Sequence, residues 1–433
     1  MDSMALAAIV VAVLLFGFLL SGMWVGLALA SAGIFIFLFL IGDNQIAMLG
    51  RLQFNQANSF VLSAVPFFIF MGYVLINSGL SDMVYDSVTP LVSFIPGGLL
   101  HTNVVAGSVF GATCGTSTAG TAAVGALAIP QLRKRNYDKK LTYGSIAAGG
   151  TMSALIPPSL TFIVYGAMVN ESVGKLFIAG ILPGVLMTVL FMTYIATRAI
   201  TNPAVAPKET VDKARLVRGL VGLLPVGLMV VLVLGAIYAG VATPTEAAAM
   251  GGVGALILAA GYKRLTWRVF KTTTLDTVKL TSMVMILVVG AIYFSMALSI
   301  LRLPSMLTAW LVSLPFHRMT IFAFVIVFYI VLGMFMEGTA ILLLSLPLTF
   351  PVAMSLGFDP VWFGVMVTVL IQVGLLTPPF GMDVFIVHKL SGDQDIVPAF
   401  RGAFPFMLLM LVTAVILMIW PDIATWLPSK MIG

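Results

Sequence analysis

The chain has 433 residues, of which 60% are hydrophobic and 9% charged, and its mean hydropathy is +1.12. Soluble domains carry about 25% charged residues, so this composition excludes an ordinary soluble protein and predicts a polytopic all-α protein embedded in a lipid bilayer. The net charge of +6 comes mainly from loop Lys and Arg, which bear on membrane orientation and do not indicate nucleic-acid binding. The single cysteine, Cys114, excludes an internal disulfide and a cysteine-based metal cluster.

Apolar segments long enough to cross a hydrocarbon core roughly 30 Å thick recur along the first half. The N-terminus lacks the basic region and cleavage site of a secretory signal, so we expect a first membrane span there. The predicted spans are 5–20, 23–42, 60–78, 142–168 and 176–198. The apolar region 102–130 is too long for one span and is broken at Gly115-Thr-Ser-Thr118, which predicts a re-entrant hairpin.

The second half repeats the first at an offset of 221 residues. At this offset the pair Pro157-Pro158 falls on Pro378-Pro379, and Thr118-Ala119 falls on Thr339-Ala340. The corresponding spans are 219–241, 244–262, 280–300, 361–387 and 402–420, with a second broken region at 320–351. We therefore predict a first repeat over 1–198 (scaffold spans 5–78, hairpin 102–130, broken helix 142–168), a linker over 199–218, and a second repeat over 219–433 (scaffold spans 219–300, hairpin 320–351, broken helix 361–387).

The loop charges predict that the second repeat is inverted in the membrane. The loop 131–141 holds five Lys/Arg, whereas its counterpart 352–361 holds none. The positive-inside rule places the first loop in the cytoplasm and the second outside, and the basic segments 199–218 and 263–279 then also lie in the cytoplasm. Both termini come out on the periplasmic side. Inverted repeats are typical of secondary transporters, whose site lies at the midplane where the broken elements meet.

The two hairpin tips are the first candidate site. The first tip offers hydroxyl and freed carbonyl oxygens, which suit a hard cation such as Na⁺, and the helix that follows directs its N-terminus at the same space, which favours an anion. The alternative is a small-residue helix-packing face. A matching break at Met336-Glu-Gly-Thr339 favours a site.

The two proline pairs are the second candidate feature. Proline removes an N–H and disfavours helix at the preceding residue, so carbonyls near 150–153 and 374–377 are freed close to the hairpin tips. A kink used only for packing is the alternative, but the symmetric pair favours two related cation sites.

Two acids lie within these elements, Glu337 at the second tip and Asp383 just past the second proline pair. Intramembrane acids indicate function by default, so either is a candidate for binding a cation or a proton. Asp383 has two further interpretations, a hydrogen bond within the bundle or orientation of a substrate hydroxyl. Nucleophile constellations, phosphate loops and metal clusters are missing from the sequence, so we do not expect an enzyme.

The sequence resembles the large membrane (permease) subunit of TRAP (tripartite ATP-independent periplasmic) transporters over nearly its whole length. The resemblance rests on Val65-Pro-Phe-Phe-Ile-Phe-Met-Gly72, Phe94-Ile-Pro-Gly-Gly98, Gly107-Ser-Val-Phe-Gly-Ala-Thr-Cys-Gly-Thr-Ser117, Ala148-Gly-Gly-Thr-Met-Ser153, Ile156-Pro-Pro158, Gly180-Ile-Leu-Pro-Gly184 and Thr377-Pro-Pro-Phe-Gly381.

The resemblance implies an elevator-type transporter in the bacterial or archaeal inner membrane that imports an organic acid with a sodium gradient. It further implies a periplasmic substrate-binding protein and a separate small four-helix membrane subunit as partners. The implied Na⁺ ligands are Gly115, Thr116, Ser117, Gly150, Ser153, Pro157, Met336, Glu337, Gly338, Thr339, Gly374, Thr377 and Pro378. The predicted substrate-binding residues are Ser117, Thr118, Ala119, Thr151, Thr339 and Asp383. A stand-alone sodium- or proton-coupled anion symporter is the alternative, and neither the transported acid nor the ion count follows from the sequence.

Overall fold

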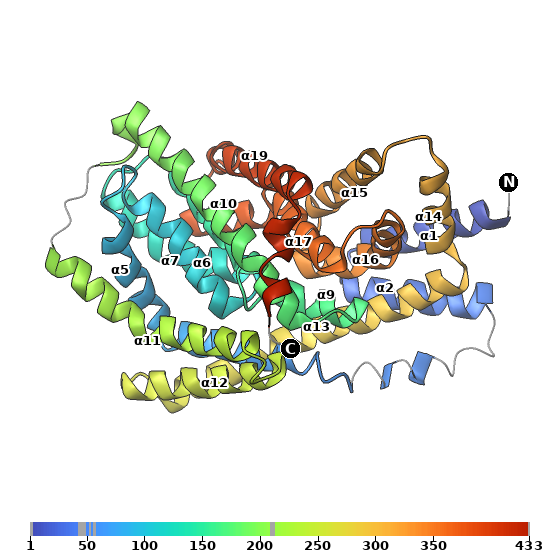
Figure 1. The fold of residues 1–433 in the computed structure, drawn as a ribbon, viewed down its shortest axis with the longest axis horizontal. Helices are drawn as coiled ribbons and strands as arrows, with labels where there is room; N and C mark the ends of the chain where they lie inside the picture. The colour runs from blue at the N-terminus through green and yellow to red at the C-terminus, as the bar shows by residue number, and fades with distance from the viewer. Residues whose placement is uncertain (1–2, 42–48, 52, 55–57, 208–212, 432–433) are drawn as a thin grey trace.

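The computed structural model describes residues 3–41, 49–51, 53–54, 58–207 and 213–431, and these residues form helices and connecting turns without a strand (Figure 1). The first half contains α1 (Ser3–Leu20), α2 (Val25–Ile36), η1 (Phe37–Ile41), α4 (Ala64–Asn77), α5 (Leu80–Val92), α6 (Leu99–Cys114), α7 (Ser117–Lys134), α8 (Lys139–Leu155), α9 (Leu160–Val169), α10 (Val173–Thr201) and η3 (Pro203–Val205). The second half contains α11 (Lys213–Tyr238), α12 (Pro244–Gly261), α13 (Trp267–Ile300), α14 (Leu303–Ser313), α15 (Arg318–Gly333), α16 (Gly338–Ser355), α17 (Pro360–Leu376), α18 (Met382–Ser391), α19 (Val397–Ile419), α20 (Asp422–Thr425) and η4 (Pro428–Lys430).

The helices confirm a polytopic membrane protein. Within the described ranges, seven helices are long and apolar enough to cross a bilayer, and an eighth is counted if the bent pair α4 and α5 forms one span. Shorter apolar helices, among them α15 and α17, accompany them. The predicted number of ten crossings and the position of each terminus stay predictions, and residues 42 and 208–212 of the predicted span and linker lie outside the described part of the chain.

The 221-residue offset reappears in the helix boundaries. Shifted by 221, α7 coincides with α16 and α8 coincides with α17, residue for residue. The same capping interaction starts α8 and α17: the side chain of Asp138 accepts a hydrogen bond from the Leu141 amide at 2.8 Å, and Asp359 accepts one from the Trp362 amide at 2.8 Å. Such caps satisfy amides at a helix start that have no partner within the helix. Asp138 and Asp359, which correspond at the same offset, therefore start equivalent helices.

Helices of the two halves pack in reciprocal pairs. The pair α2 and α13 corresponds at the offset to the pair α12 and α4, and in Figure 1 α13 runs beside α2. In the same way α7 packs against α18 while α16 packs against α9. Reciprocal contacts of this kind characterise a two-fold relation between similar units. They support the predicted repeat, while the inverted placement of the halves in a membrane stays a prediction.

Glycines allow the outer helices α2 and α13 to approach at backbone distance. A Cβ atom placed on Gly290 of α13 would lie 2.1 Å from the carbonyl oxygen of Gly26, and one on Gly33 of α2 would lie 2.7 Å from the carbonyl carbon of Tyr293. Close approach through small residues is a general means of packing helices in lipid, where burial of apolar surface drives little association. These glycines therefore hold the outer layer together.

Three segments differ from the sequence-based prediction. The segment after 78, for which no span is predicted, forms α5, because Gly79 turns the chain at φ +70° and a new amphipathic helix begins 74° away from α4. Its counterpart α14 follows Arg302 at φ +58° and was also missed. The prediction of a loop over 263–279 is wrong from residue 267 onward. Thr266 caps the start of α13 there, so the helix begins well before its apolar part.

We predict that Gly290→Ala lowers the thermal stability of the purified protein in detergent by roughly 1–3 kcal/mol, because the added methyl group meets the Gly26 backbone. Gly227→Ala in α11 is the matched control, since a Cβ atom there meets nothing within 4 Å. The expected result is a lower melting temperature for the first variant and an unchanged or higher one for the second. Equal melting of Gly290→Ala and wild type would show that the glycine contact is not required.

Candidate functional site

The first hairpin tip joins α6 to α7 through a left-handed glycine. Gly115 has φ +67° and its amide donates to the Gly111 carbonyl at 3.1 Å, which ends α6. Thr116 is extended, and α7 begins at Ser117 without a side-chain cap on its first amides. The N-terminus of α7 therefore keeps backbone donors and a positive dipole end at the tip.

The first tip contacts the first proline break, as predicted. The Leu160 amide at the start of α9 donates to the Gly115 carbonyl at 3.0 Å, and the Pro158 carbonyl oxygen lies beside Gly115. Ser159 bridges the break: its hydroxyl donates to the Ala154 carbonyl at 2.5 Å and accepts from the Phe162 amide at 3.4 Å. Groups freed by the break are thus paired across it, and the Gly115 carbonyl retains one lone pair for a ligand.

The N-terminal turns of α7 also pack tightly on α8. A Cβ atom on Gly150 would lie 1.7 Å from the Thr121 hydroxyl oxygen, and one on Gly120 would lie 2.0 Å from the Ser153 hydroxyl oxygen. The Ser153 hydroxyl itself donates to the Gly107 carbonyl at 3.2 Å. Gly150 and Ser153 therefore lie against the start of α7, the arrangement expected of residues near a tip.

A buried carboxylate from the second half completes this region. Asp383 lies in the first turn of α18, is 0% exposed, and accepts a hydrogen bond from the Ser117 hydroxyl. Thr121, one turn further along α7 and also buried, faces the same carboxylate. Neither Oδ1 of Asp383 nor the Thr121 hydroxyl oxygen has a hydrogen-bond partner among the described residues. A carboxylate and two hydroxyls thus meet at the N-terminus of α7, with two oxygens left for a ligand.

The second tip is built differently, because a side chain caps it. The Glu337 carboxylate accepts hydrogen bonds from the amides of Thr339 at 3.0 Å and Ala340 at 3.3 Å, and from the Thr339 hydroxyl at 3.1 Å. A side-chain cap of this kind satisfies the first amides of α16 and complements its dipole. Glu337 is also an electrostatic neighbour of Asp383, so the two acids of the second half lie in one region.

The two proline breaks differ in exposure. Pro157 and Pro158 are buried, whereas Pro378, Pro379 and Phe380 are exposed. The ring of Phe380 lies 5.8 Å from that of Phe335, which is exposed as well. The structure therefore encloses the first break and leaves the second one open.

The remaining predicted residues lie at or beside the two tips and the broken helices α8 and α17. Gly374 meets Gly333 at backbone distance, and Gly338 packs on Ile371 and Leu375, so the second tip adjoins α17. The hydroxyls of Thr151 and Thr377 donate to the Ala148 and Val373 carbonyls of their own helices at 2.7 Å each. Thr118, Ala119 and Met336 are half-buried.

Sequence reasoning missed Thr121 and Ser159. Thr121 follows Ser117 by four residues and so shares its helix face, a spacing that pointed to a second hydroxyl beside the tip. Ser159 directly precedes an apolar run, which is the pattern of an N-cap.

The predicted basic loop after α7 is tied to the second half by Asp393. This carboxylate, 16% exposed, pairs with Lys139 at 2.7 Å and Arg133 at 3.2 Å and accepts a hydrogen bond from the Tyr143 hydroxyl. Burial alone would raise the pKa of Asp393, but the hydrogen bonds from Lys139 and Tyr143 and the charges of Lys139 and Arg133 outweigh burial and lower it. The end of α7, the start of α8 and the loop after α18 are therefore held together.

Comparison with known proteins identifies the family. Residues 12–423 match the family model of the tripartite ATP-independent periplasmic transporter, DctM component. The chain belongs to this family. It is a large permease subunit of the TRAP type, and the sequence-based recognition is confirmed.

Curated relatives extend over almost the entire chain. The C4-dicarboxylate TRAP transporter large permease protein DctM of Pseudomonas aeruginosa is 33% identical, over 90% of this chain and 92% of that protein. The sialic acid large permease SiaM of Vibrio cholerae is 30% identical, covering 96% and 97%. The 2,3-diketo-L-gulonate large permease YiaN of Escherichia coli is 33% identical, covering 98% and 100%. A crystal structure of the YdaH transporter of Alcanivorax borkumensis shares the fold, with a TM-score of 0.66 and 16% identity over 93% of this chain and 98% of that one.

We predict that Asp393→Asn lowers the free energy of unfolding at pH 7 by about 1–2 kcal/mol, because charge-assisted hydrogen bonds are lost. A carboxyl whose pKa is lower in the folded state stabilises the fold above its unfolded pKa of about 3.9. The stabilisation is lost as the pH falls through the lower folded pKa, so wild type and variant should converge in acid. Tryptophan fluorescence during thermal unfolding between pH 3 and pH 8 measures this, with the exposed Asp422→Asn as control. A difference that does not shrink as the pH is lowered from 7 to 3 would contradict the charge interpretation.

Proposed function

We propose that this permease subunit imports an organic acid together with Na⁺ by an elevator movement, with the site formed where α7, α9 and α18 meet. The observation that carries the proposal is the buried Asp383 carboxylate against the Ser117 hydroxyl at the first tip. A fully buried carboxylate is costly unless a positive charge or a proton accompanies it, so this position calls for a cation in the transport cycle.

Sodium coupling is supported by the kind of atoms that converge there. The Gly115 carbonyl, the Ser117 and Thr121 hydroxyls and the Asp383 carboxylate supply oxygens, which hard cations prefer. The predicted second cation site would use Met336–Thr339 with Gly374, Thr377 and Pro378, where Glu337 already serves as a cap. A proton on Asp383 is the alternative coupling ion at the first site.

An organic anion is supported by the free start of α7 and by the relatives. The amides at Ser117, Thr118 and Ala119 have no side-chain cap, whereas Glu337 occupies the equivalent position on α16. The uncapped helix end therefore favours a carboxylate near the first tip. Relatives named for C4-dicarboxylates, sialic acid and diketogulonate all handle organic acids, so we assign that substrate class and no single compound.

The elevator movement is supported by the unequal exposure of the two breaks. If the halves exchange conformations, the buried Pro157-Pro158 break opens while the exposed Pro378-Pro379 break closes. In this cycle the outer helices of 5–78 and 219–300 stay fixed, and the hairpins with the broken helices move. Sodium binds first and reduces the negative charge at the tip, and the organic anion binds afterwards. The coupling free energy between the two binding events is ~1–3 kcal/mol.

The partners we propose are a periplasmic substrate-binding protein and a separate small four-helix membrane subunit, in a bacterial inner membrane with both termini periplasmic. The family description as a tripartite periplasmic transporter supports three components. The stand-alone symporter is the competing assignment. Neighbouring genes for a binding protein and a four-span protein would decide for the tripartite form.

We predict that uptake into proteoliposomes containing this chain, the small subunit and the binding protein requires an inward Na⁺ gradient. Replacing external Na⁺ with K⁺ should reduce initial uptake of the matching acid at least tenfold, because the oxygen cluster then lacks its cation. The control is an imposed proton gradient without Na⁺. Full uptake in that control would overturn sodium coupling and favour the proton alternative.

We predict that Asp383→Asn and the double variant Ser117→Ala with Thr118→Ala each reduce sodium-driven uptake by about one to two orders of magnitude while the proteins stay folded. Both changes remove oxygen ligands from the first site and so weaken the binding of its cation. Transport then slows even when the binding protein delivers the substrate. The Na⁺ concentration for half-maximal uptake should rise for both. Normal uptake and normal sodium dependence in the double variant would refute the assignment of the first tip.

A further inference from the structure

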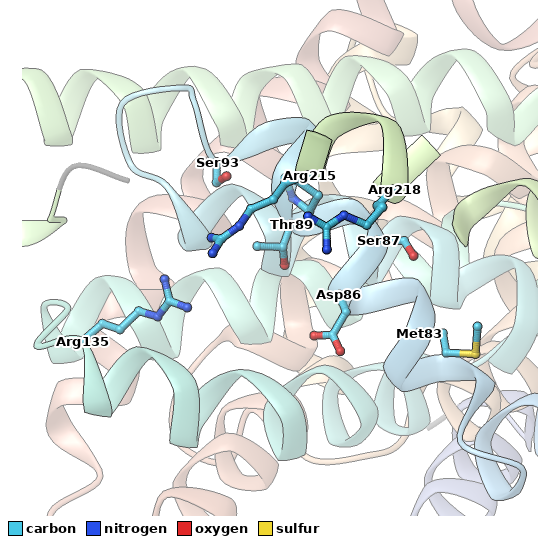
Figure 2. A pocket seen from close by; sticks show the side chains of 10 residues that line it. Met83, Asp86, Ser87, Thr89, Ser93, Arg135, Arg215 and Arg218 are labelled. Atoms are coloured by element: carbon cyan, nitrogen blue, oxygen red, sulfur yellow. The ribbon is translucent and has the colours of Figure 1, made fainter. Parts of the chain in front are cut away.

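A second polar site lies away from the transport region, between α5, the end of α7 and the start of α11. This pocket of about 370 Å³ is lined by Arg135, Arg215 and Arg218 together with Asp86 and the polar groups of Ser87, Thr89 and Ser93. Figure 2 shows the three guanidinium groups reaching into the space around Asp86 from two helices on either side. Among the described residues that line the pocket, the two guanidinium groups of α11 alone outnumber the one carboxylate, and this favours an anion.

A close helix contact holds the two arginines of α11 over α5. A Cβ atom on Gly219 would lie 2.6 Å from the Ser87 carbonyl oxygen, and one on Gly222 would lie 2.3 Å from the Ser87 hydroxyl oxygen. The helices therefore touch at backbone distance one residue after Arg218. The arginines of α11 therefore line a pocket whose walls are two closely packed helices.

An apolar path leads away from this pocket along α11. Val221, Leu228 and Leu232 continue at helical spacing from Arg218 and are 59%, 58% and 60% exposed. Leu228 and Leu232 also line a groove of about 600 Å³ between α11 and α12, whose lining is almost entirely apolar and includes Met250 and Ile257. A charged pocket followed by an apolar groove on one helix matches the two parts of an amphiphile.

We propose that the arginine pocket binds the phosphodiester headgroup of an anionic phospholipid, whose acyl chains lie along α11. Guanidinium groups bind phosphate oxygens through paired, charge-assisted hydrogen bonds. Arg135 and the α11 arginines belong to the basic segments that the charge pattern places in the cytoplasm, so the lipid comes from the cytoplasmic leaflet, where basic pockets attract anionic headgroups. The inference is independent of the transported acid and of the coupling ion.

Native mass spectrometry of the full-length protein in detergent tests this, with phosphatidylglycerol compared to phosphatidylcholine of the same acyl chains. Wild type should bind phosphatidylglycerol more tightly than phosphatidylcholine. Arg215→Gln with Arg218→Gln should weaken phosphatidylglycerol binding about 25-fold, since each surface arginine contributes about fivefold. The matched control is Arg268→Gln with Lys271→Gln, which removes two exposed cations of α13 outside the pocket.

Asp86→Asn provides a second variant whose expected effect has the opposite sign. It removes the negative charge in the pocket, so binding of phosphatidylglycerol should strengthen, a result that misfolding would not produce. Equal binding by wild type and the arginine variant would overturn the proposal. Displacement of the lipid by millimolar inorganic phosphate, with no preference for phosphatidylglycerol, would identify a site for free anions and overturn the lipid assignment. Displacement by the small membrane subunit would likewise show that a protein occupies the groove.

Discussion

The fold depends on one constraint, that a backbone group freed within a membrane must find a partner inside the protein. Three interruptions of central helices in the described chain satisfy this constraint through a specific interaction. The Gly115 carbonyl receives the Leu160 amide, Ser159 bridges the ends of α8 and α9, and Glu337 caps α16. Because these interactions join a tip to a break, the same residues that permit irregular backbone also position the oxygen atoms of the candidate site.

The two halves meet this constraint by different chemistry, although their helices coincide in sequence. At the first tip the position equivalent to Glu337 is Thr116, and the carboxylate near α7 comes from Asp383 of the other half. One helix start is thus capped within its own hairpin, while the other has no side-chain cap and places its first hydroxyl against a carboxylate from across the repeat boundary. Unequal tips allow the two candidate cation sites to differ in affinity and in order of filling.

The sequence predicted the parts of the fold that follow from hydrophobic length and from repetition. Both hairpins, both proline breaks and the equivalence of Asp138 with Asp359 could be read directly, because apolar runs and repeated residues record them. The helices α5 and α14 could not. In α5, Asp82, Asp86 and Pro90 give a polar, proline-containing composition, and the neighbours that cover its apolar face, among them α11 and α6, lie far away in the sequence or after it. The pairing of Ser117 with Asp383 was also beyond the sequence, because it joins residues 266 positions apart.

The helices α5 and α14 carry a geometric consequence for movement. Each connects an outer helix to a hairpin through a left-handed residue at its start, Gly79 or the residue Arg302. With 13 and 11 residues, they measure about 20 Å and 16 Å at 1.5 Å per residue. If the hairpins move as proposed, these two helices fix how far each hairpin lies from the outer helix that precedes it in the chain. Lengthening either helix by one turn would increase that distance by about 5 Å.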